Sequence, residues 1–74
     1  MKPFVIAGDL GESGGRIELL NHPHGWGVYV FDPSGDCTQD YLQDTLKIAI
    51  EFAQEDLGAD PTSWRIEQSS SSDL

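Results

Sequence analysis

Apolar and polar residues alternate in short runs along the first half of the chain, and these runs predict β-strands. Residues 3–7 (PFVIA) form an apolar run that ends in turn residues. Residues 16–20 (RIELL) alternate, with Ile17 and Leu19 on one face. Residues 26–31 (WGVYVF) have the composition most typical of a strand. We therefore expect three consecutive strands before the middle of the chain.

The segments between these runs carry turn residues. Residues 21–25 (NHPHG) combine Pro and Gly in a short link that suits a hairpin. Residues 32–36 (DPSGD) place Pro second and Gly fourth, which fits a type I turn. Residues 8–15 (GDLGESGG) lack the lysine and Ser/Thr of a phosphate loop, and we expect only a flexible connection there.

The period of the pattern changes to that of a helix over residues 38–57. At about 100° per residue, several apolar side chains fall into one band. They are Leu42, Leu46, Ala49, Ile50, Ala53 and Leu57. Asp36 or Thr38 is the expected N-cap, and Gly58 suits the position just after the last turn. We expect a single long helix here.

A last alternating run, residues 63–68 (SWRIEQ), predicts a fourth strand that lies most simply beside the first. The polar tail of residues 69–74 (SSSSDL) is expected to be disordered. The predicted fold is α+β, in the order β-β-β-α-β. A small, mostly antiparallel four-stranded sheet carries one helix on one face, in a single domain of residues 1–68.

This fold leaves the second face of the sheet uncovered. Trp26, Val28 and Val30 would face the core, whereas Tyr29 and Phe31 would face the other way. Aromatic residues scattered on an open sheet face are common. They are also enriched at interfaces, so Tyr29 and Phe31 are candidates for a dimer or partner contact.

The composition restricts the partners. The 74 residues carry 13 acidic and 4 basic side chains, for a formal net charge of −9. Such a charge repels nucleic acid and anionic membranes and favours basic protein partners. With one cysteine, Cys37, no intramolecular disulfide can form, and no apolar run resembles a signal peptide or membrane span. We expect a cytoplasmic protein.

Acidic residues recur along the predicted helix and would project from one side of it. They are Asp36, Asp40, Asp44, Glu51 and Glu55, with Lys47 interrupting. The stripe is either a solvated helix face with local pairs to Lys47 or a docking surface for a basic protein.

The sequence gives little support for a metal site or a catalytic site. His22 and His24 are two possible ligands, but a tetrahedral metal site needs three or four. Cys37 lies near the expected helix start, where Asp36 and Asp40 oppose a reactive thiolate. We predict no catalytic residue, no metal and no cofactor.

The stretches IELLNHPHGWGVYV and TLKIAIEFAQ resemble small immunity proteins of bacterial polymorphic toxin systems. In some of these, a strand pair joined by an Asn/Pro/Gly-containing turn carries a Gly-Trp-x-apolar core and precedes an apolar helix. The residues that carry the resemblance are Ile17, Leu19, Asn21, Pro23, Gly25, Trp26, Val28 and Val30. The resemblance implies a bacterial protein that inhibits a toxin enzyme by binding it, and it assigns no contact residues.

The resulting hypothesis is a non-enzymatic, acidic protein-binding module, of inhibitor or immunity type, that docks on a basic partner through the acidic stripe, Tyr29 and Phe31. One alternative is a small homodimeric ligand-binding protein, with a pocket between open sheet faces lined by Trp26, Tyr29 or Phe31. A second is a metal-binding or enzymatic protein that uses His22 and His24.

Overall fold

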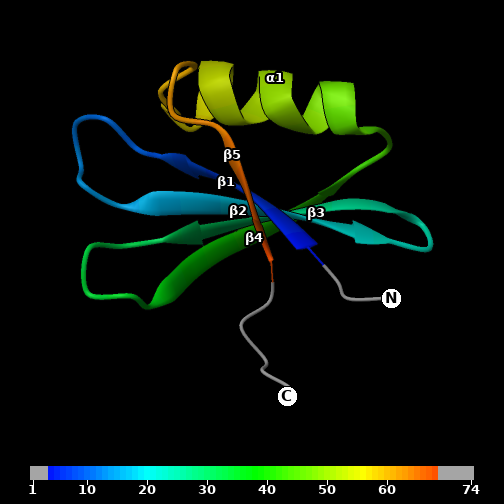
Figure 1. The fold of residues 1–74 in the computed structure, drawn as a ribbon, viewed down its shortest axis with the longest axis horizontal. Coiled ribbons are helices and arrows are strands. Elements are labelled where there is room, and N and C mark those ends of the chain that lie inside the picture. Colours follow the sequence, from blue (N-terminus) through cyan, green and yellow to red (C-terminus); the bar gives the residue numbers. More distant parts are fainter. Residues whose placement is uncertain (1–3, 69–74) are drawn as a thin grey trace.

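The computed structural model describes residues 4–68, which form one antiparallel sheet and one helix. The elements are β1 (Phe4–Asp9), β2 (Arg16–His22), β3 (Gly25–Phe31), β4 (Cys37–Gln43), α1 (Leu46–Asp56) and β5 (Arg65–Gln68). The strand order across the sheet is β4-β3-β2-β1-β5 (Figure 1). The disorder predicted for residues 69–74, and the strand start predicted at Pro3, lie outside the described residues.

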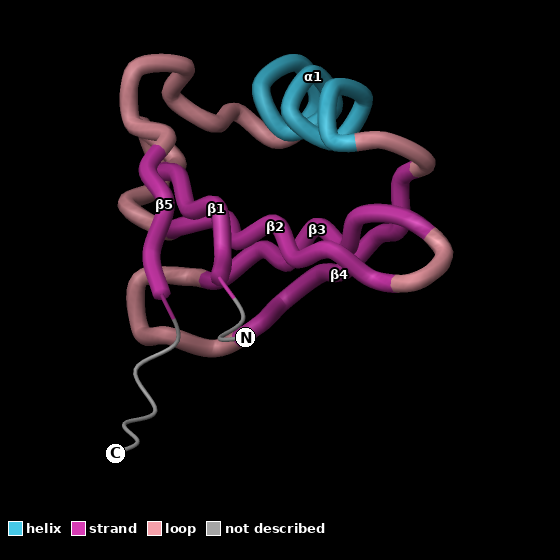
Figure 2. Tube along the Cα trace, turned by 45° about the vertical axis from the view of Figure 1, so that its right-hand side comes forward, coloured by secondary structure: helices cyan, strands magenta, loops and turns pink. Residues whose placement is uncertain are grey.

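The molecule has two layers, with α1 alone on one face of the sheet (Figure 2). The α+β class, the antiparallel sheet and the single helix are confirmed, and the last strand does pair with the first. The predicted number of four strands is wrong, because the sheet has five. Helix α1 has 11 residues, and no helix within residues 4–68 is long and apolar enough to cross a membrane.

The core lies between α1 and the central strands. Ile17 and Leu19 of β2 and Val28 of β3 are the largest fully buried side chains. They pack against two small helix residues, Ala49 and Ala53, which are also fully buried. Because alanine has a short side chain, the helix axis can approach the sheet closely. The predicted inward orientation of Trp26, Val28 and Val30 is confirmed by their place in or against this core.

The helix predicted for residues 38–57 is wrong over its first part, where the chain forms β4. Strand β4 pairs with β3, with Val28 opposite Tyr41 and Tyr29 opposite Asp40. Thr38 and Tyr41 favour strands, and Asp40 is a poor helix former. The turn at residues 32–36 reverses the chain so that it runs back beside β3. Hydrogen bonds to β3 then pair backbone N–H and C=O groups of β4 that would otherwise have paired within a helix.

Helix α1 begins and ends where its residues cap it. The Thr45 hydroxyl accepts a hydrogen bond from the Ile48 N–H at 3.2 Å, so Thr45 is the N-cap rather than Asp36 or Thr38. At the other end Gly58 has a positive φ of 84°, which turns the chain out of the helix as predicted.

A second glycine allows three strands to meet at one corner of the sheet. The β2–β3 hairpin has a two-residue loop, because His22 is the partner of Gly25. Gly25 has a φ of 148°, and a Cβ atom placed on it would lie 2.3 Å from the carbonyl oxygen of Gln43 at the end of β4. The close approach of β4 to this corner therefore requires a residue without a side chain.

Candidate functional site

The sheet face opposite α1 divides into two halves of different chemistry. The half formed by β5, β1 and β2 carries a network of ion pairs. Arg16 contacts Glu67 at 2.8 Å and Glu18 at 3.0 Å. Arg65 contacts Glu67 at 2.9 Å and Asp9 at 3.3 Å. The charges of this half are largely compensated within the chain.

The ion-pair network covers this half of the sheet face and shifts the pKa values of two of its members. Ala7 of β1 lies on this face, opposite Glu18 and Arg65, yet it is fully buried. Hydrogen bonds from Arg16 and then Arg65 lower the pKa of Glu67 below its usual value, and the bond to Glu67 raises the pKa of Arg65. This half of the open face is thus a covered, internally paired surface.

Replacing Glu67 with glutamine is expected to reduce stability in a pH-dependent way. The lowered pKa means that Glu67 stabilises the fold above its ordinary pKa of 4.5, and that this contribution is lost as the pH falls through the lowered value. Because the side chain is 36% exposed, we expect a loss of only about 0.5–1 kcal/mol at pH 7.

The measurement is urea unfolding of the original protein and of Glu67→Gln at pH 7 and pH 3. The difference between their free energies of unfolding should be smaller at pH 3. Glu12→Gln is the control, because Glu12 lies in the exposed β1–β2 loop and makes no ion pair within residues 4–68. A difference for Glu67→Gln that stays constant between the two pH values would contradict the ion-pair explanation.

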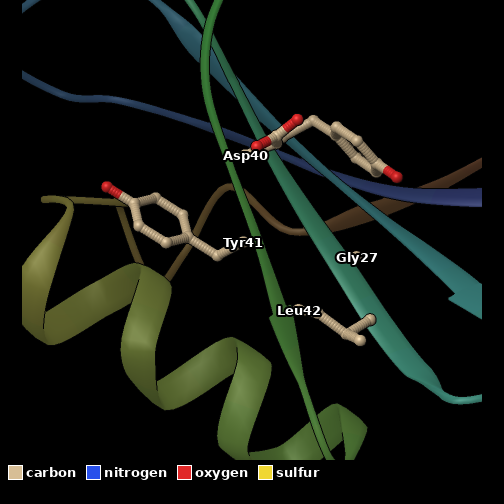
Figure 3. Close-up of a pocket in the computed structure, with 5 residues that line it drawn as sticks. Gly27, Asp40, Tyr41 and Leu42 are labelled. Carbon is tan, nitrogen blue, oxygen red and sulfur yellow. The ribbon is translucent and has the colours of Figure 1, made fainter.

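The other half of the open face, formed by β3 and β4, has a shallow hollow of about 300 Å³. Gly27, Tyr29, Asp40 and Leu42 line it, together with Tyr41 at its rim (Figure 3). Figure 3 shows Tyr41 pointing toward the helix, whereas Asp40 and Leu42 point away from it. The hollow thus combines an aromatic ring, an aliphatic side chain and a carboxylate.

Gly27 shapes this hollow by leaving room for two side chains above it. His22 Nε2 and the Tyr29 hydroxyl form a hydrogen bond of 2.8 Å, with the two rings edge to face. A Cβ atom on Gly27 would lie 2.7 Å from the Tyr29 ring and 2.8 Å from His22 Nε2. The Tyr29 ring therefore lies along β3 and is held in place by His22.

Strand β4 is the most exposed element of the sheet. It pairs with β3 on one side, and no strand within residues 4–68 pairs with its other side. Leu42 is 57% exposed and Tyr41 is 39% exposed, although the Tyr41 ring contacts Phe52 of α1 edge to face. We call residues 36–44 the β4 edge, which comprises β4 and the aspartate on each side of it.

The five acidic residues predicted to share one helix face do not do so, because the helix begins only at Leu46. Asp36 directly precedes β4, Asp40 lies within it, and Asp44 follows it. Glu51 and Glu55 lie on α1, on the other side of the sheet from Asp40. The first three are spaced along the β4 edge, roughly 13 Å apart at about 3.3 Å per residue, and are separated from the other two.

The two arginines in the described part of the chain are both engaged in the ion-pair network, so the β4 edge has no arginine partner there. Asp36, Asp40 and Asp44 form no ion pair within residues 4–68 and are exposed. Unpaired carboxylates on an exposed surface attract cationic groups.

Two other aspartates serve turns. Asp32 accepts hydrogen bonds from the Ser34 hydroxyl at 2.6 Å and from the Asp36 N–H at 3.0 Å, and these bonds lower the pKa of Asp32. The backbone N–H and hydroxyl of Thr62 lower the pKa of Asp60 in the same way. In each residue one carboxylate oxygen, Oδ1, accepts these local hydrogen bonds, which assigns Asp32 and Asp60 to their turns.

The residues considered for metal or nucleophile chemistry lie apart. No group of three or more His, Cys, Asp or Glu residues that could hold a metal occurs in the range 4–68. His22 is hydrogen bonded to Tyr29, and His24 is exposed in the hairpin loop. Cys37 is exposed at the start of β4 and not near the start of the helix, as had been expected.

Sequence reasoning placed Tyr29 and Phe31 on the open face, and the register supports this because Tyr29 lies opposite Glu18 and Phe31 opposite Arg16. It missed Leu42, which had been placed on the helix and in its core band. A signal for the hollow existed in Gly27, because a glycine within an apolar strand often marks a close approach of other groups.

Comparison with known proteins adds no constraint on this site. The chain matches no protein-family model, no curated protein and no solved structure. The site must therefore be interpreted from its own geometry and charge.

Proposed function

We propose that the protein is a non-enzymatic, acidic binding module that docks on a basic protein partner through the β4 edge and the adjoining hollow. Inhibition of an enzyme by covering its basic surface, as in an immunity-type protein, is the activity that this arrangement suits best. The hollow at Tyr29 and Leu42 supplies apolar contact, and the aspartates of the β4 edge supply charge.

This proposal is based on a contrast between the two halves of the open face: the carboxylates of one half are paired with arginines, and those of the β4 edge are not. On one half of the open face, Asp9, Glu18 and Glu67 are paired with arginines of the same chain. On the β4 edge, the aspartates have no such partner within residues 4–68, and they flank exposed apolar side chains. A complementary cationic surface would compensate this charge and accelerate association.

Reversing the charge of the β4 edge should abolish binding. The test begins with a basic protein captured on the immobilised chain at low salt, eluted by salt and then purified. The triple variant Asp36→Lys, Asp40→Lys, Asp44→Lys is expected to bind it about 100-fold more weakly, because each lysine adds repulsion where an attraction is lost. Isothermal titration at two salt concentrations measures the affinity.

The matched control is the triple variant Glu51→Lys, Glu55→Lys, Asp56→Lys on α1, which changes the net charge equally. It should stay within about tenfold of the original affinity, since screening weakens charges more than a Debye length from the contact. Equal losses for both variants would indicate attraction by net charge alone. The proposal would be refuted if neither variant weakened binding or if no basic protein were captured.

The homodimer remains a second hypothesis, but its pocket would differ from the one expected. Trp26 packs against the core on the helix side, so it cannot line the same cavity as Tyr29. Light scattering at increasing protein concentration distinguishes the two functions, because the binding module is expected to stay monomeric without its partner.

A further inference from the structure

We infer that the basic partner contributes an extended segment that pairs with β4 as a sixth strand of the sheet. This inference rests on the proposed function and specifies how the partner binds. It requires a free strand edge, side chains suited to an incoming strand, and charges that select the occupant. The β4 edge meets each of these requirements.

The free edge of β4 is long, with one irregularity near its start, where the register with β3 shifts between Gln39 and Cys37. Its seven residues, CTQDYLQ, would span about 24 Å at 3.4 Å per residue. They include no proline or lysine, the residues that usually prevent pairing at a sheet edge. The opposite edge strand, β5, has only four residues, and its Arg65 is held in ion pairs.

Backbone groups on the free side of β4 have no strand partner within residues 4–68. In a β-strand, alternate residues direct their N–H and C=O groups to opposite sides, so about half of the β4 groups face away from β3. The first six β4 residues are exposed. An added strand would replace water at these groups, which is the usual source of affinity in β-strand addition.

Side chains on both faces of β4 are placed to contact such a strand. Leu42 and Asp40 lie on the open face, and Tyr41 lies on the helix side. Neighbouring strands lie about 4.8 Å apart, so the alternate side chains of an added strand would contact these residues. A segment that alternates cationic and aliphatic residues fits, with its cations beside Asp40 and its aliphatic groups beside Tyr41.

Charge selects a basic segment of another protein rather than a second copy of this chain. In an antiparallel pair of β4 strands centred on Asp40, the two Asp40 residues would face each other, and Asp36 of one copy would approach Asp44 of the other. Like charges directly opposite each other destabilise a sheet. Each copy also carries a net charge of −9.

The inference can be tested with a defined probe, the capped peptide Lys-Val-Lys-Val-Lys-Val-Lys. NMR hydrogen exchange of the whole chain is measured with and without the peptide. Alternate amides of β4 should exchange at least about tenfold more slowly at saturation, because they gain hydrogen bonds to the added strand. The amides of β5 should be unchanged.

The control peptide has the same sequence with N-methyl groups on two adjacent central residues, which block a donor on each edge and leave the charge unchanged. It is expected to bind up to about tenfold more weakly, because one backbone hydrogen bond to β4 is lost whichever edge of the peptide faces β4. Equal affinity of the two peptides, or binding without protection of β4, would overturn strand addition and leave charge-based docking intact.

Two further outcomes separate this inference from the proposed function. If the peptide fails to bind while the charge-reversed β4 edge still loses its protein partner, the partner docks through a folded surface and strand addition is wrong. If β4 amides become protected as protein concentration rises without any peptide, a second copy occupies the edge and the inference is also wrong.

Discussion

Replacing Leu19 with alanine is expected to lower the free energy of unfolding by about 3 kcal/mol. Leu19 is fully buried in the middle of β2, opposite Ile6 on one side and Val28 on the other. Its removal would leave a cavity that two neighbouring strands cannot close without breaking their pairing. A core this small rarely supplies more than about 3–5 kcal/mol, so the variant should be largely unfolded.

Urea unfolding followed by tryptophan fluorescence measures this effect. The matched control is Leu20→Ala, since Leu20 follows directly in the same strand but points to the open face and is only partly buried. It should cost about 1 kcal/mol or less. Equal losses for the two variants would contradict the assignment of the helix-side face as the core.

Replacing Gly25 with alanine is expected to cost roughly 2–5 kcal/mol and to detach the end of β4 from β3. The new Cβ would lie 2.3 Å from the Gln43 carbonyl oxygen, and this backbone oxygen cannot move without shifting the strand. The φ of 148° adds strain for any residue with a side chain. Hydrogen exchange should show faster exchange at Leu42 and Gln43 than at β2.

Gly35→Ala is the control that separates backbone strain from steric overlap. Gly35 also has a positive φ, of 97°, but no atom beyond its two neighbours in the chain lies within 4 Å of the position of its Cβ. It should therefore cost only about 1–2 kcal/mol, with little effect on β4. If Gly35→Ala destabilised the protein as much as Gly25→Ala, the close approach of β4 to this corner would not explain the requirement for glycine.

Most of the sheet could be predicted from the sequence because three of its strands are covered on one face. Burial imposes alternation on β2 and β3, whose inward residues Ile17, Leu19 and Val28 are fully buried. β2 and β3 are the strands whose environment differs clearly between their two faces. The position of the last strand beside β1 was predicted as the simplest connection and not from burial, since Ile66 of β5 is 70% exposed.

Strand β4 could not be recognised in this way. Its first six residues are exposed, so no face of β4 requires alternation. Leu42 also falls at helical spacing from Leu46 and Ala49, and Tyr41 falls at helical spacing from Ile48, which extended the apparent helix. The useful local signal was Thr45, a good N-cap immediately before residues with high helix propensity.

The error in β4 carried over to the candidate site. Five carboxylates share one face only if residues 36–55 form one helix, and the strand divides them between the sheet edge and α1. The outward orientation of Tyr29 did not depend on the helix and was recovered. The hollow beside it depends on the pairing of Gly27 with Leu42, a long-range register that the local pattern does not encode.

The position of β5 has a consequence for the order of folding. Strands β1 to β4 follow one another in the sheet as they do in the chain, so their pairing closes only short loops. Pairing β5 with β1 joins residues at opposite ends of the fold, with Phe4 opposite Gln68. Because such non-local pairing has the largest loop-closure entropy, we expect docking of the four-residue β5 to complete folding. During synthesis from the N-terminus, the edge of β1 that pairs with β5 therefore stays without a strand partner until β5 is made.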